Sequence, residues 1–216
     1  MKYLQKNDVS KQLTEDIISK CECFPLLCNL YKNHANEGIS FFERPKVYFE
    51  TELSELKKRP DKIKYACIAL CVMYNDFVPF EIFTSESNVK AKQIFHVVFE
   101  ECEVNHSIPK KTVKAQFESM VGSFFSKTQT GYKSIHDYMF DIYCHHICSN
   151  MLRCVLEYAD SKLLCDRALL KSIEHKPMFS HIVIPMEFES MFFQGIEQDI
   201  INGKVWDVFF SLSDEV

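Results

Sequence analysis

The stretch Gly131–Tyr158 constrains the fold of this chain most, because a short strand is followed there directly by a long amphipathic helix. Tyr132–Ile135 alternates apolar and polar side chains after a Thr-Gly pair that favours a turn, which predicts a strand. Asp137 can cap the helix that follows. The apolar positions of this helix recur at helical spacing: Phe140, Tyr143, Ile147, Met151, Val155 and Tyr158.

His136 stands between the predicted strand and the predicted helix. The unpaired N–H groups and the dipole of a helix start attract anions, so His136 is a candidate phosphate-sensing residue. Asp137 and Asp141 already place carboxylates at this helix start, and a structural histidine is the more common occupant of such a position. The residues alone leave both roles open.

The composition predicts a globular chain of ordinary charge. Its 216 residues, 47% of them hydrophobic, suffice for one sizeable core or two small ones. The formal net charge of −5 argues against a protein that coats nucleic acid. The N-terminus lacks the apolar stretch of a signal peptide, and no stretch approaches the ~18 apolar residues of a membrane span. We therefore expect a cytoplasmic protein with no membrane association.

Ten cysteines without a secretory signal indicate free thiols in a reducing compartment. Two groups have spacings that suggest a metal site: Cys21, Cys23 and Cys28, and Cys144, His145, His146 and Cys148. On a helix, Cys144 and Cys148 share a face while His145 points about 100° away, which spoils a tetrahedral ligand set. We expect no metal site and assign these cysteines to a helical core.

Periodicity predicts a mainly α-helical chain with a β-hairpin near its middle. Helices are expected over Leu13–Lys20, from Pro25 onward, and over Pro45–Lys58, Ile63–Tyr74, Val89–Glu103, Thr112–Val121, Asp160–Ser172 and Met186–Asn202. Ser123–Lys127 would pair with Tyr132–Ile135, and His181–Ile184 is a further short strand. Helices followed by a hairpin predict a winged helix over residues 45–136.

A winged helix often binds DNA, so that function is an alternative. Its expected recognition helix begins with Lys110 and Lys111 and adds Lys114, but Glu118 interrupts the basic surface and no Arg is present. Guanine recognition favours Arg, and a grip on phosphates needs a broader basic surface. We therefore expect no nucleic-acid partner.

Motifs for catalysis are missing from the sequence. It contains no G-x-x-x-x-G-K-[ST] phosphate loop, no G-x-S-x-G and no H-E-x-x-H. His145 and His146 lie within a predicted helix, where a histidine is usually packed or solvated. We predict a protein that is not an enzyme and has no catalytic residue.

Five motifs in order carry a resemblance to a known family: FPLLC (Phe24–Cys28), FFERP (Phe41–Pro45), YKSIHD (Tyr132–Asp137), IVIP (Ile182–Pro185) and NGKVWDVF (Asn202–Phe209). The chain resembles the back half of a novel STAND-type NTPase. These are metazoan signal-transduction ATPases similar to nucleotide-binding immune receptors. The similarity covers nearly the whole chain and depends on the ordered spacing of the motifs.

The resemblance implies a domain organisation. In the family a P-loop ATPase domain precedes a helical segment, a winged helix and a helical linker, and repeats such as ankyrins often follow. Residues 1–44 would end the helical segment, residues 45–136 would form the winged-helix-like domain, and residues 137–216 would form the long helix and the C-terminal helical region. This chain would start after the ATPase core, so ADP or ATP would bind only with an ATPase domain present, in cis or in trans.

The resemblance also implies roles for three residues. Phe24 and Pro25 are similar to the family's proline-containing motif that packs on adenine. His136 matches the winged-helix histidine that, in related immune receptors, contacts the β-phosphate of ADP and holds the closed state. Two departures stand out, because Gly195 occupies a position where arginine is common and Ser134 replaces an aromatic residue.

We therefore expect a non-catalytic regulatory portion of a STAND-type NTPase, which senses the nucleotide state and keeps signalling inhibited, in innate immunity among other settings. Its partners would be the ATPase domain and, through C-terminal repeats, other proteins. A stand-alone protein-interaction module and a winged-helix DNA binder are the alternatives.

Overall fold

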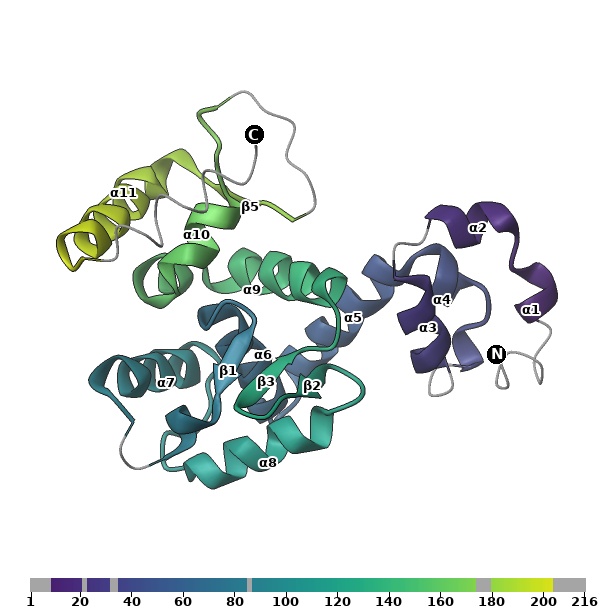
Figure 1. Ribbon diagram of the computed structural model, residues 1–216, viewed down its shortest axis with the longest axis horizontal. Coiled ribbons are helices and arrows are strands. Elements are labelled where there is room, and N and C mark those ends of the chain that lie inside the picture. The colour runs from purple at the N-terminus through teal and green to yellow at the C-terminus, as the bar shows by residue number, and fades with distance from the viewer. Residues whose placement is uncertain (1–8, 21–22, 32–34, 85–86, 174–179, 204–216) are drawn as a thin grey trace.

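The computed structural model describes residues 9–20, 23–31, 35–84, 87–173 and 180–203. The chain is mainly helical, as the periodicity predicts, and it has two small sheets (Figure 1). Within these ranges, no helix combines the length and apolar character needed to cross a membrane. Cys21 and most of the motif Asn202–Phe209 lie outside the described residues.

Six elements form the central unit: α6 (Ile63–Met73), β1 (Phe77–Pro79), α7 (Val89–Glu101), α8 (Lys110–Met120), β2 (Phe125–Lys127) and β3 (Gly131–Ser134). Their antiparallel sheet has the strand order β1-β3-β2. The predicted hairpin is confirmed, with Ser126 opposite Lys133. One helix, an edge strand, two helices and a hairpin make a winged-helix-like unit, while its limits as a domain at residues 45–136 stay a prediction.

Strand β1 is missing from the sequence-based prediction, which treated these residues only as the end of a helix. It pairs with β3 in the register Phe77 to Lys133 and Pro79 to Gly131. Three residues are too few to show a period of two, and Pro79 argues against a strand. At the edge of the sheet the missing N–H of proline is tolerated, and the 3-10 turn η4 (Phe80–Phe83) follows at once.

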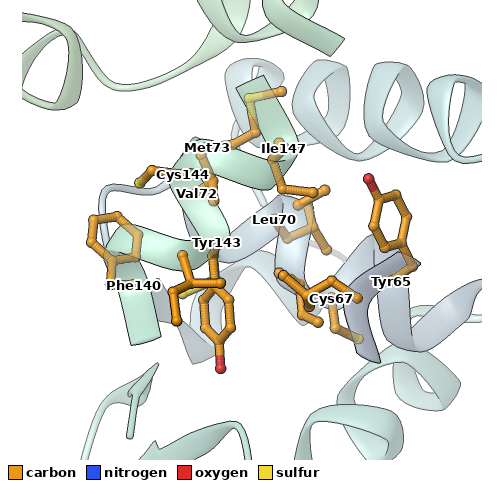
Figure 2. Close-up of a cluster of buried hydrophobic side chains, with 14 of the residues drawn as sticks. Tyr65, Cys67, Leu70, Val72, Met73, Phe140, Tyr143, Cys144 and Ile147 are labelled. Carbon is orange, nitrogen blue, oxygen red and sulfur yellow. The ribbon is translucent and has the colours of Figure 1, made fainter. Parts of the chain in front are cut away.

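Helix α6 is the centre of the core. Every residue from Tyr65 to Met73 is buried, because α7, α8 and α9 (Asp137–Tyr158) pack around it. Figure 2 shows Leu70, Val72 and Met73 among side chains of α9 such as Phe140 and Ile147. A helix that is apolar on all sides is stable only inside a protein, as the sequence predicted for this segment.

Helix α9 begins where the sequence predicted, but Asp137 is not its cap. Asp137 is the first helical residue, and the N-cap is His136, whose side chain accepts a hydrogen bond from Tyr138 N–H. The helix also bends at Met151, where φ is −145° and ψ is 43°. Its apolar stripe is therefore divided between two helical segments.

The N-terminal elements gather at one end of α5 (Pro45–Lys58) (Figure 1). They are short: α1 (Val9–Gln12), α2 (Glu15–Lys20), α3 (Phe24–Leu30), the 3-10 turn η3 (Ala35–Glu37) and α4 (Ser40–Glu43). Pro25 and Pro45 occupy the first turns of α3 and α5, as predicted, because the N–H that proline lacks has no helical partner there. Tilted and edge-on ring contacts join Phe24, Tyr31, Phe41, Phe42, Tyr48 and Phe49.

The C-terminal elements correct one predicted helix. The helix expected over Asp160–Ser172 ends early, as α10 (Ser161–Arg167), and continues as strand β4 (Ala168–Leu170). Strand β5 (Ile182–Ile184) pairs with it in parallel, which a local pattern cannot reveal. Helix α11 (Met186–Ile201) follows, and the predicted C′ residue Gly203 has a φ of +81°. No residue of α11 is fully buried: Phe188, Met191, Phe192 and Ile196 are partly buried, and Ile200 is 37% exposed.

Replacing Gly131 by alanine should destabilise the sheet, because a Cβ there would lie 2.4 Å from the carbonyl oxygen of Val78. We expect a loss of about 1–3 kcal/mol in the free energy of unfolding, measured by urea denaturation. Gly195→Ala is the matched control, since its Cβ would meet only Leu156 O at 3.5 Å inside a helix. That variant should gain about 0.5–1 kcal/mol. Equal effects of the two substitutions would contradict this account.

His146 is a buried titratable group in the core. Its ring lies edge-on to Tyr65 at 5.8 Å between centroids, and neither its Nε2 nor the Tyr65 hydroxyl has a hydrogen-bond partner. Burial, with the charge of Lys57 second, lowers the pKa of His146, and Glu50 opposes this shift. The unfolded chain therefore binds a proton more readily than the folded one, so stability falls as the pH drops below about 6.5.

His146→Phe should flatten the pH dependence of stability, because phenylalanine keeps a ring in the cavity and does not titrate. We expect wild type to lose more unfolding free energy than this variant between about pH 6.5 and pH 5, by urea denaturation at each pH. Tyr65→Phe keeps the imidazole and should follow the wild-type slope. Parallel curves for wild type and His146→Phe would disprove the assignment.

Candidate functional site

His136 joins the hairpin to α9 through its backbone and its ring. Its carbonyl accepts hydrogen bonds from the N–H groups of Met139 (2.9 Å) and Phe140 (3.1 Å), and its Nδ1 accepts one from Tyr138 N–H at 3.1 Å. The ring is exposed. An Nδ1 that accepts leaves the proton of the neutral imidazole on Nε2, so Nε2–H is the donor that this ring can offer to a ligand.

An ion-paired turn fixes the strand that precedes His136. Asp76 is buried and accepts a hydrogen bond from Ser134 N–H at 2.9 Å. Lys133 lies 3.5 Å from a carboxylate oxygen of Asp76 and 3.5 Å from one of Asp137, and Asp76 is the main cause of its raised pKa. Asp76 itself has a φ of +67°, and the hydrogen bond to β3 holds this unusual backbone.

The electrostatics at this helix start do not favour a free anion. One ammonium group, that of Lys133, lies between two carboxylates. Asp137 occupies the first turn of α9, where the helix dipole favours negative charge. A phosphate at His136 therefore needs further positive charge from outside these residues.

A hollow of about 760 Å³ lies beside the start of α9. It is lined by Asp16, Ile17, Phe42, Glu43, Arg44, Pro45, Lys46, Val47 and Tyr138. Its cations and carboxylates are mixed, and Tyr138 brings the first turn of α9 into it. The hollow therefore places the FFERP motif next to the helix that His136 caps.

None of the three residues predicted for nucleotide contact lines this hollow. Phe24 is half-buried, with its ring 5.8 Å from that of Phe42, and Pro25 is exposed. His136 precedes the lining residue Tyr138 by two positions. The structure thus brings the two motifs to one region through Phe42 and Tyr138, which the sequence did not single out individually.

Lysines expected on a DNA-reading surface contact the protein itself. Lys110 donates hydrogen bonds to Ile82 O (2.9 Å), Thr84 O (3.3 Å) and Ser87 Oγ (2.5 Å), and burial lowers its pKa. The ammonium of Lys114 lies 4.7 Å from the centre of the Phe80 ring. These contacts hold both cations against η4 rather than leaving them for phosphate.

Glu118 of α8 neutralises the hairpin in the same region. It accepts hydrogen bonds from Lys127 at 2.6 Å and from the Tyr132 hydroxyl at 2.8 Å. The carboxylate of Glu118 thereby links α8, the expected recognition helix, to the hairpin. It lies on the surface that would meet DNA. A like charge there opposes the approach of a phosphate backbone.

The cysteines of α9 are packed in the core. Burial raises the pKa of Cys148 to about 12 and raises that of Cys144 as well. Both thiols therefore stay protonated at neutral pH, whereas metal binding needs thiolate. Among the residues that the structure describes, no three His, Cys, Asp or Glu side chains converge in a way that would hold a metal ion.

Comparisons with protein-family models, with curated proteins and with solved structures find no match to this chain. A function must therefore be argued from the residues and contacts described above.

His136→Ala should cost about 1 kcal/mol of unfolding free energy, since it removes the side-chain acceptor of Tyr138 N–H. His136→Asn should retain most of the stability, because asparagine is among the best N-cap residues. Thermal unfolding of the two variants beside wild type tests the capping role. An alanine variant as stable as wild type would show that the cap contributes nothing.

Proposed function

We propose that this chain is a non-catalytic regulatory module that reports the nucleotide state of a STAND-type ATPase domain. The observation that carries the proposal is the position of His136, an exposed imidazole fixed between the hairpin of a winged-helix-like unit and the first turn of α9. The order of its motifs, which resembles the back half of that family, agrees with this function.

The capping hydrogen bond supports a sensing role because it sets the tautomer. With Nδ1 held by Tyr138 N–H, the ring offers Nε2–H to an acceptor such as a phosphate oxygen. A ligand held there ties the winged-helix-like unit to the domain that binds the nucleotide. Its loss or exchange frees the unit to rotate, which is a common form of switching between domains.

The local charges support a sensor that works only with a partner. Lys133 is shared between Asp76 and Asp137, so this lysine does not by itself supply the positive charge that a diphosphate requires. A P-loop domain supplies its own lysine and helix N-terminus to the phosphates. The module then contributes one hydrogen bond, which forms only when the nucleotide is bound. This agrees with an ATPase domain as the partner of the chain, in cis or in trans.

A protein-interaction module that lacks the switch is the second candidate, and α11 favours it. Three apolar residues of this helix are largely exposed: Met186 (68%), Phe193 (53%) and Ile201 (69%). Exposed apolar residues on one element favour contact with another protein. DNA binding is not proposed, because Lys110 and Lys114 contact the protein itself and Glu118 lies between them and the hairpin.

The test is ADP release from a STAND-type ATPase domain loaded with a fluorescent ADP analogue, with and without the full 216-residue chain. We expect wild type to slow release. His136→Asn, which keeps the helix cap and removes Nε2–H, should release ADP about tenfold faster than wild type, the value of one charge-assisted hydrogen bond.

His145→Gln is the matched control, since it removes an exposed imidazole of α9 that lies beside Glu50 rather than at the helix start. It should slow ADP release as well as wild type does. A chain that binds the ATPase domain without affecting release would favour the interaction module. Equal release with wild type and His136→Asn would reject the sensing role.

A further inference from the structure

Two exposed histidines form a pair beside helix α7 of the winged-helix-like unit. His96 belongs to α7 and His106 to the loop that follows it. Their Nδ1 atoms are 3.3 Å apart, their ring centres are 4.6 Å apart, and their planes stand at 79° to one another.

The backbone holds the two rings together. Helix α7 ends at Glu101, and Glu103 takes a φ of +54°, which lets Val104 N–H bond back to Phe99 O at 2.7 Å. Asn105 Oδ1 then accepts a hydrogen bond from Ser107 N–H at 2.8 Å. The chain thus reverses beside α7, and His106 returns next to His96 through fixed turns.

The separation of the two nitrogens suits a shared metal ion. Two imidazole nitrogens each about 2.0–2.1 Å from a metal, at the tetrahedral angle, lie about 3.3–3.4 Å apart. The two Nδ1 atoms are 3.3 Å apart, joined by a hydrogen bond that one ring donates to the other, and this distance equals that spacing. Neutral imidazole is a good ligand for Zn²⁺, Ni²⁺ and Cu²⁺, and a bound ion would replace the hydrogen bond: the donor ring takes the tautomer with its proton on Nε2, so that both Nδ1 lone pairs are available to the metal.

Charges of both signs lie near the pair. Glu100 lies one helical turn after His96 on α7, and Glu103 forms an ion pair with Lys62. Lys92, one turn before His96, is the opposing charge on the same helix. Because no third His, Cys, Asp or Glu completes the set among the described residues, water or a ligand from another molecule would fill the remaining positions.

We propose that His96 and His106 form a surface site for a divalent transition metal, bound through their Nδ1 atoms with an open part of the coordination shell. The site lies apart from His136 and does not depend on the function proposed above. It is separate from the cysteines of α9, whose thiols are buried and protonated. Its ligand set of two imidazoles and water favours Cu²⁺ and Ni²⁺ over Mg²⁺ or Ca²⁺.

The experiment is calorimetric titration of the tag-free, full-length chain with Ni²⁺ alone at pH 7.5. We expect one Ni²⁺ per chain for wild type. His96→Gln and His106→Gln should each weaken binding about tenfold or more, because each removes one of the two protein ligands. His145→Gln, which removes another exposed imidazole, should bind as wild type does.

The absorption spectrum with Co²⁺ adds a readout of ligand type. A cobalt complex without a thiolate charge-transfer band, lost in His96→Gln and His106→Gln, supports the pair as the ligand. Absence of Ni²⁺ binding by wild type, unchanged binding in both variants, or a thiolate band would each overturn the proposal. Circular dichroism of every variant shows that the fold is retained, as expected for substitutions at exposed positions.

Discussion

The burial of α6 is the constraint on which the rest of the structure depends. A helix with every residue from Tyr65 to Met73 out of water is stable only if other elements cover all of its sides. Helices α7, α8 and α9 and the small sheet provide that cover. The position of α9 along α6 then decides where its first turn lies, and so where His136 stands on the surface.

A second interaction couples this core to the surface. The turn after α6 places Asp76 at a φ of +67°, and its carboxylate accepts the Ser134 N–H of β3 and pairs with Lys133. Strand β3, which leads into His136, is therefore tied to the end of the most buried helix. A displacement of the His136 ring would be transmitted to the core by a short segment of hydrogen-bonded backbone and not by a flexible loop. This connection is what a switch at the helix start requires, because local contacts must move a whole unit.

The charge pattern also limits what the protein can do by itself. Lys110, Lys114 and Lys127 are held by backbone carbonyls, by the Phe80 ring and by Glu118 respectively. The start of α9 carries its own carboxylates, so it is a poor anion site in isolation. His136 and the pair His96 and His106 are exposed, and these are the groups for which we propose ligands. The nucleotide sensing proposed for His136 needs a partner domain, and the metal binding proposed for His96 and His106 needs an ion.

The sequence by itself determined the mainly helical fold, the hairpin, the prolines at the first turns of α3 and α5, and the place of His136 between strand and helix, because these follow from local periodicity and backbone preference. Only the tertiary structure decided the rest. Strand β1 and the parallel pair β4–β5 exist through partners distant in sequence, and His136 rather than Asp137 caps α9 because the end of β3 holds His136 in an extended backbone. The tertiary structure also decided the hollow at Phe42 and Tyr138 and the pairing of His96 with His106. Both form between separate segments of the chain, and a local sequence pattern does not predict such contacts.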